Sequence, residues 1–275
     1  MLKAFNLNFY YLKRMKAAKV LIIVLLSLII FAMGVTNLAE VLTKSTVDTV
    51  GVTQEGVGIS YTDIVEPEVN SICKSYMSDI AGALILLFIA IFAVIFAHKD
   101  DKNGYVKNIV PQLKHKGDMV FARLANIAIY TAFVFVVYFI VNVVMSMILY
   151  PEKKFGFSAD FLLILLVQFV LHLAFASFCD FLTTLSRSSA FGITIGVLFS
   201  SGFHVMATQL MNVLETAIFG KLTVDFNNAL TFTHITKLNI YANSDKMIMG
   251  LIVALIHLVV WNGLSYLITS KRDVV

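Results

Sequence analysis

The sequence predicts an all-α integral membrane protein, because its apolar residues are numerous and are grouped into long runs. Of the 275 residues, 59% are hydrophobic and 14% are charged, and the mean hydropathy is +0.86. A chain of this composition would not stay soluble as a monomer in water. A helix needs about 20 apolar residues to cross a hydrocarbon core of about 30 Å, and several runs have this length. We expect residues 1–275 to form a single transmembrane domain.

Six runs are long enough to cross the membrane as helices. They cover residues 19–39, 80–98, 122–150, 161–184, 190–213 and 247–269. The fifth run is interrupted by polar residues, namely Ser200, Ser201, His204, Thr208 and Gln209. We nevertheless expect one transmembrane helix from each of the six runs.

The positions of lysine and arginine give the orientation, because these residues are retained on the cytoplasmic side of a membrane. Residues 1–19, 98–123, 185–189 and 270–275 hold 14 of the 21 basic residues. Acidic residues are biased the other way, and 12 of the 17 fall in the intervening segments 40–79, 150–160 and 214–246. Both termini are therefore predicted to be cytosolic. The net charge of +4 then reflects loops that face anionic lipid, and gives no reason to expect a nucleic acid partner.

Three segments outside the spans have features of their own. Residues 1–18 place Leu2, Phe5 and Phe9 at helical spacing among basic residues, which is typical of an amphipathic helix in the membrane interface. A solvated basic leader is the alternative. Residues 40–79 are predicted to form an extracellular loop. Residues 215–246 are predicted to form an extracellular or re-entrant segment with one or two short helices.

Polar residues recur at helical spacing within the last three spans. Ionisable groups cost about 2.5–3.5 kcal/mol at the centre of a transmembrane helix, so they tend to face the protein interior or a wet cavity. One interpretation is a translocation path lined by Gln168, His172, Ser201, His204 and His257. The other is a set of hydrogen bonds between helices, with no transported substrate. Asp180, near the cytosolic end of its span, is expected to pair with Arg187 or to be solvated.

The loop between the second and third spans carries the sequence that suggests a family. It reads Gly104-Tyr105-Val106-Lys107-Asn108-Ile109, and Arg123 follows near the start of the third span. With six spans, a basic amphipathic leader and a large first outer loop, this arrangement resembles the ABC-2 type permeases of bacteria. Among these, it looks most like the permeases that export cytolytic peptides such as phenol-soluble modulins. The family often has a glutamate after the second span, where this chain has His98-Lys99-Asp100-Asp101.

This resemblance implies the transmembrane subunit of an ATP-driven ABC exporter in the bacterial plasma membrane. Its substrates would be amphipathic peptides or lipid-like molecules, and it would form a homodimer or a heterodimer with a related permease. Two copies of a separate ATP-binding subunit would dock on loop 98–118, where Gly104, Tyr105, Val106, Lys107, Asn108 and Ile109 would couple ATP hydrolysis to transport. This chain is then not an enzyme and binds no cofactor, since ATP and magnesium would be bound by the partner.

The sequence also contains no P-loop of its own, because its single Gly-Lys pair at Gly220 is followed by leucine and lacks the upstream glycine. The alternative function is a stand-alone proton-coupled secondary transporter or channel, in which His172, His204 and His257 form a proton relay. No internal repeat is visible in the sequence, which disfavours a transporter built from inverted repeats.

Overall fold

The computed structural model describes residues 2–50, 71–102, 113, 115–220, 226–238 and 244–271, and this part of the chain is almost entirely helical. No strand occurs in these ranges, so the all-α prediction is confirmed. The helices are, in chain order, α1 (Leu2–Arg14), α2 (Lys16–Val50), α3 (Ile72–Ala81), α4 (Ala83–Lys102), α6 (Asp118–Leu149), α7 (Ala159–Ser186), α8 (Ser189–Ser200), α9 (Phe203–Phe219), α10 (Phe226–Ala229), α11 (Thr231–Lys237) and α12 (Ser244–Lys271).

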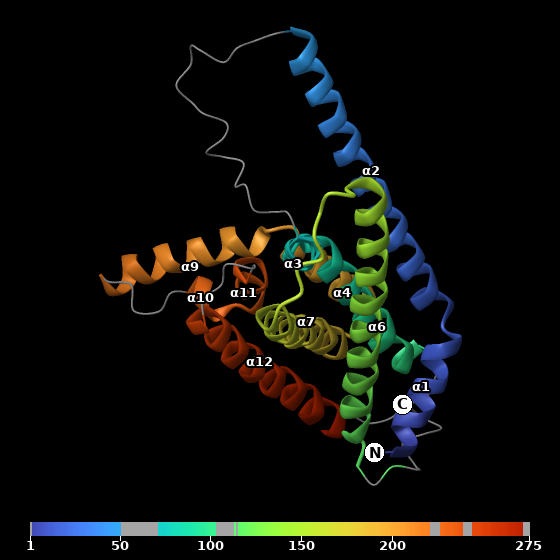
Figure 1. Cartoon of the computed structure of the whole chain (residues 1–275). Coiled ribbons are helices and arrows are strands. Elements are labelled where there is room, and N and C mark those ends of the chain that lie inside the picture. The colour runs from blue at the N-terminus through green and yellow to red at the C-terminus, as the bar shows by residue number, and fades with distance from the viewer. Residues whose placement is uncertain are drawn as a thin grey trace.

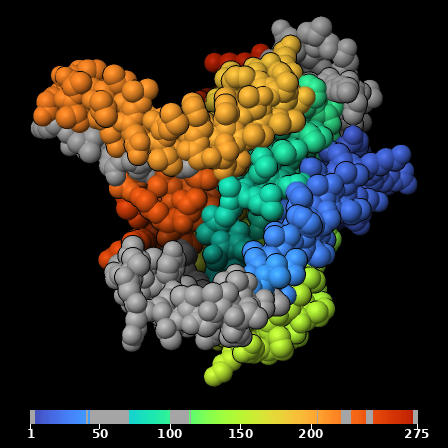
Figure 2. Space-filling view, turned by 90° about the horizontal axis from the view of Figure 1, so that it is seen from above, coloured from blue at the N-terminus to red at the C-terminus, as the bar shows by residue number. Residues whose placement is uncertain are grey.

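Four of these helices are long and apolar enough to cross a membrane, namely α2 over Lys16–Ala39, α6, α7 and α12. Two further pairs reach that length only together: α3 with α4, bent by 54°, and α8 with α9, bent by 80°. By length and composition, the described residues therefore provide four candidate spans, or up to six if each bent pair is one span. The predicted run 190–213 is thus not one straight helix. It divides at Gly202, whose φ of +94° is a conformation that glycine adopts readily, and α9 projects away from the packed helices (Figures 1 and 2).

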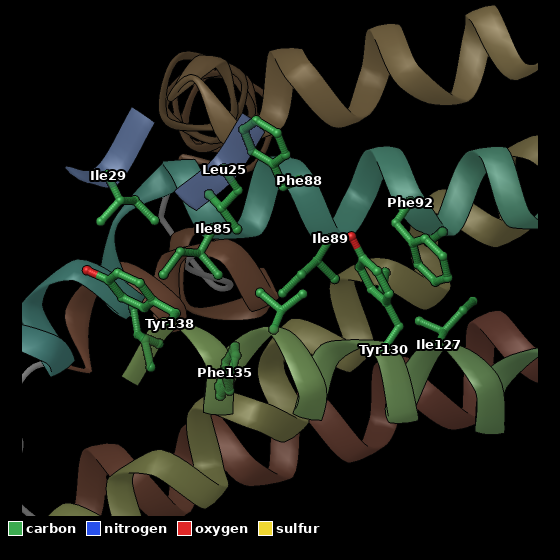
Figure 3. Close-up of a cluster of buried hydrophobic side chains, with 14 of the residues drawn as sticks. Leu25, Ile29, Ile85, Phe88, Ile89, Phe92, Ile127, Tyr130, Phe135 and Tyr138 are labelled. Atoms are coloured by element: carbon green, nitrogen blue, oxygen red, sulfur yellow. The ribbon is translucent and has the colours of Figure 1, made fainter. Parts of the chain in front are cut away.

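Helix α4 lies at the centre of the packed helices and contacts α2, α6, α7 and α8. Its apolar side chains Ile85, Ile89 and Phe92 are fully buried against α2 and α6 (Figure 3). Phe92 stacks on Tyr130 of α6, with ring centroids 3.5 Å apart. The outward faces of α2 and α12 are apolar and exposed, as the lipid-facing side of a membrane helix would be.

Helix α1 is held at one end of the helix bundle. It packs against α6, and the buried Lys99 of α4 donates a hydrogen bond of 3.1 Å to Asn8 Oδ1. The Lys99 ammonium also lies 3.5 Å from the centroid of the Phe96 ring. The start of α6 and the end of α12 lie at this same end (Figure 1). Exposed Lys13 and Arg14 leave α1 basic on its outer side, although its position in a membrane interface stays a prediction.

The segments predicted as outer loops are partly helical. α2 continues to Val50 and α3 begins at Ile72, which leaves residues 51–70 outside the described part of the chain. Within 215–246, α9 ends at Phe219, and two short helices follow. Residues 231–235 of α11 are all buried, and α11 packs against α7. Their depth in a bilayer stays a prediction.

Local signals fix where α7 and α8 begin. Ser158 Oγ accepts a hydrogen bond from the backbone N–H of Phe161, and Ser188 Oγ accepts one from Phe191. Both are N-caps, which supply a partner to a helix N–H group that otherwise has none. α7 ends at Arg187, which has a left-handed backbone with φ of 55°. The short turn between these helices keeps α8 beside α7.

Two glycines on one face of α8 allow it to approach its neighbours closely. Gly192 and Gly196 are four residues apart, the small-residue spacing that favours close packing of membrane helices. A Cβ added at Gly192 would clash with Thr183 Oγ1 and lie 3.0 Å from Val94 Cγ2. At Gly196 the nearest atom, Ala90 Cβ, would be 3.4 Å away, which is an ordinary contact.

We predict that Gly192→Ala destabilises the protein by about 1–3 kcal/mol, because α8 must move away from α4 and α7. Gly196→Ala is the matched control, since both variants gain the same helix propensity. It should change the free energy of unfolding by less than about 1 kcal/mol, because the added Cβ causes no clash. Thermal unfolding in detergent measures the difference. Equal shifts for the two variants would show that α8 does not depend on this close contact.

Candidate functional site

Polar side chains line the buried faces of α6 and α7 from one end of the bundle to the other. Hydrocarbon offers no hydrogen-bond partners, so buried polar groups between membrane helices are either structural links or functional groups. This polar seam is the candidate functional site. Its fully or nearly fully buried members are Arg123, Asn126, Thr131, Tyr138, Asn142 and Ser146 on α6, and Gln168, His172, Ser177, Asp180, Thr183 and Thr184 on α7.

An ion pair closes the seam at the end where α1 lies. Arg123 Nε is 2.5 Å from Asp180 Oδ1, and Arg123 Nη2 donates hydrogen bonds to Asp180 Oδ2 at 2.8 Å and to Thr184 Oγ1 at 2.9 Å. The two charged side chains are only 6% and 4% exposed. The prediction that Asp180 pairs with Arg187 or is solvated is therefore wrong. Arg187 caps the exposed end of α7, whereas Arg123 faces Asp180 from the neighbouring helix.

A second polar cluster lies at the opposite end of the seam. The carboxylate of Asp79, in the last turn of α3, accepts hydrogen bonds from the Tyr138 hydroxyl and from Asn142 Nδ2, the latter at 3.1 Å. Lys153 lies nearby and donates to Ser75 Oγ at 3.3 Å. Sequence reasoning missed this cluster because Asp79 falls in the segment predicted to be a loop. The four-residue spacing of Tyr138 and Asn142 was the signal that could have revealed one side of it.

The predicted path residues are distributed over several places. Gln168 Nε2 donates hydrogen bonds to the carbonyls of Ile235 and Leu238, at 2.9 and 2.8 Å, and so holds the end of α11 against α7. His172 lies one turn further along α7, with Nδ1 2.8 Å from the Gln168 carbonyl oxygen and its ring edge-on to Phe135. These two residues are brought together, and both make contacts between helices.

The remaining path residues lie elsewhere. His257 contacts the Thr231 hydroxyl and lines a small aromatic pocket with Phe178 and Trp261, between α7, α8, α11 and α12. Ser201 is exposed at the end of α8, and its Oγ donates to the Leu198 carbonyl at 3.0 Å. The side chain of His204 lies outside the described part of the structure. A role of these residues in translocation stays a prediction.

The predicted coupling residues Gly104, Tyr105, Val106, Lys107, Asn108 and Ile109 lie outside the described residues. Their role also stays a prediction, while the helices that flank them, α4 and α6, are described. In the described part of the chain, no group of three or more His, Cys, Asp or Glu side chains is arranged to hold a metal ion.

We predict that Arg123→Leu alone destabilises the protein by about 3–5 kcal/mol, because it leaves the Asp180 carboxylate buried without its cation. The double variant Arg123→Leu/Asp180→Leu recovers a large part of this loss, since no charge then stays buried. Arg187→Leu, at an exposed position, is the control and changes stability by about 0.5 kcal/mol or less. Unfolding in mixed micelles measures all three. Equal losses in the single and double variants would contradict a dominant role for the pair.

Comparison with known proteins identifies a family without an assigned activity. No curated protein matches the chain. A family described as "Protein of unknown function (DUF2705)" matches residues 43–275, which includes every helix from α3 to α12. Since the match covers most of the sequence, the chain belongs to the DUF2705 family.

Proposed function

We propose that this chain is the transmembrane permease subunit of an ATP-driven ABC exporter, which moves amphipathic peptides or other hydrophobic substrates out of the bacterial cell. One observation carries the proposal. The two helices that flank loop 98–118, α4 and α6, are linked again at the opposite end of the bundle. There α4 continues through Gly82 into α3, whose Asp79 accepts hydrogen bonds from Tyr138 and Asn142 of α6.

α4 and α6 also contact other helices at the end of the bundle where loop 98–118 begins and ends. α1 contacts α6 and hydrogen-bonds to Lys99 of α4, and the Arg123–Asp180 pair ties α6 to α7. Closely packed interiors transmit displacement because they resist compression. A partner that moves loop 98–118 would therefore shift α4 and α6 as stiff bodies and change the Asp79 cluster at the far end.

The bend at Gly82 provides a place where such a movement can be absorbed. α3 and α4 meet there at 54°, and a Cβ at Gly82 would lie 2.9 Å from the Asp79 carbonyl oxygen. Hinges in moving proteins are a few residues at element ends that absorb backbone rotation. The junction suits a change in the angle between α3 and α4 that would carry the Asp79 carboxylate with it.

In this proposal the energy comes from two copies of an ATP-binding subunit, which hold ATP and magnesium, and the permease acts as a homodimer or a heterodimer. The exposed apolar faces of α8, α9 and α12 are compatible with such a second subunit in the membrane. A stand-alone carrier with a histidine relay has less support. His172 is buried on α7 against Phe135 of α6, whereas His257 lines a separate pocket with Trp261.

We predict that Tyr105→Ala and Asn108→Ala abolish association with the ATP-binding subunit, while the variants still purify as folded protein. The measurement is co-purification with a cassette ATPase from the same genome, followed by its ATP hydrolysis rate with and without amphipathic peptide. Tyr150→Ala, at the other end of α6, is the control and leaves the complex intact. The proposal fails if no such ATPase binds the intact chain, or if both loop variants keep a stoichiometric, peptide-stimulated complex.

We further predict that Tyr138→Phe uncouples the two ends of the bundle. The variant loses one hydrogen bond to Asp79 but keeps its ring, so the ATPase still binds and peptide stimulation of hydrolysis falls several-fold. Tyr130→Phe is the matched control, because it keeps the stack on Phe92 of α4 and does not touch Asp79. Unchanged stimulation in Tyr138→Phe would remove the Asp79 cluster from the coupling route.

A further inference from the structure

A partly open pocket of about 250 Å³ lies beside Asp79, between α2 on one side and α3 and α4 on the other. Since one water occupies about 30 Å³ of liquid, this is room for several small groups. The residues that form its apolar wall include Ile29, Met33 and Ile85, and its polar groups include Asp79, Ser78 and Tyr138. Ile29 and Ile85 lie near Tyr138, and the Tyr138 hydroxyl points away from Phe135 and Tyr130 (Figure 3).

A carboxylate lines this largely apolar pocket. Asp79 is exposed on the pocket side and accepts hydrogen bonds from Tyr138 and Asn142. Among the described residues, Asp79 forms no ion pair and no pocket-lining residue is basic. Lys153, whose ammonium group donates to Ser75 Oγ, also attracts Asp79 but does not line the pocket. The pocket therefore combines a carboxylate with an apolar wall.

We propose that this pocket binds a primary alkylammonium group of the kind that the lysine side chain of an amphipathic peptide presents. The ammonium donates charge-assisted hydrogen bonds to Asp79, and the Ser78 hydroxyl can accept another. The four-carbon stem of lysine lies along Ile29, Met33 and Ile85, as lysine stems commonly do on apolar surfaces. A lipid headgroup that carries phosphate fits less well, because its second charge would meet a pocket wall that contains no described cation.

This inference deepens the proposed function, because the bound peptide would be the exported substrate. It concerns binding by this chain alone, so it can be tested without the ATP-binding subunit. Asp79 lies at the end of the bundle opposite loop 98–118. Movement of this loop, transmitted by α4 and α6, would therefore change the shape of the binding pocket.

The experiment measures binding of decylamine to the purified full chain in detergent by native mass spectrometry. Decanol and decyl sulfate are uncharged and anionic probes of the same chain length. We expect decylamine to bind the native protein at one saturable site. Asp79→Asn should weaken this binding on the order of tenfold or more, since the variant cannot offer a charged acceptor to the ammonium group. Asp160→Asn, an exposed acid in the first turn of α7 near the same end, is the control and binds decylamine normally.

Three results would overturn the inference: equal decylamine binding by Asp79→Asn and native protein, equal binding of decanol and decylamine, or displacement by dihexanoylphosphatidylethanolamine at the same concentration as by a lysine-containing amphipathic peptide. The last result would make the pocket a lipid site. Specific decylamine binding by a chain that recruits no cassette ATPase would refute the proposed function and leave the inference standing. A chain that forms the ATPase complex but does not bind decylamine would refute the inference and leave the proposed function standing.

Discussion

The structure depends on one constraint: polar groups buried on α6 and α7 can find hydrogen-bond partners only inside the protein, because lipid supplies none. The Arg123–Asp180 pair satisfies this constraint at one end of the seam, and the Asp79 cluster satisfies it at the other. Between them, Gln168 supplies hydrogen-bond donors to two carbonyls at the end of α11. Each of these links joins different helices, so together they set which helices are neighbours and in which register.

The positions of most helices could be predicted from the sequence, because the length of an apolar run is a strong signal for a membrane helix. Predicted spans 122–150, 161–184 and 247–269 fall within or almost within α6, α7 and α12. The bends at Gly82 and Gly202 were not predicted. Glycine permits a break without requiring one, and hydropathy averaged over 20 residues does not distinguish a straight helix from two helices at an angle.

The candidate site was predictable only in part. Helical spacing correctly placed Gln168 and His172 on one buried face of α7, but spacing within one helix does not reveal whether that face lines a path or packs against α11. The partner of Asp180 lies on another helix, 57 positions away in the sequence, so no local pattern points to it. Asp79 was assigned to a loop because it directly precedes the apolar run 80–98, and only the approach of α6 makes it part of a cluster.

The buried pair of Arg123 and Asp180 also has a consequence for how the protein is made. A lone arginine or aspartate is costly to release from the translocon into lipid, on the order of 2.5–3.5 kcal/mol at the centre of a helix, and Arg123 and Asp180 lie near the ends of their helices, where part of that cost applies. α6 and α7 are consecutive and are connected only by residues 150–158. If the two helices leave the translocon together as a hairpin, each charge enters the bilayer already neutralised by the other. On that route, insertion of this part of the chain would be a two-helix event, in which the nascent α6 waits for α7 to be synthesised.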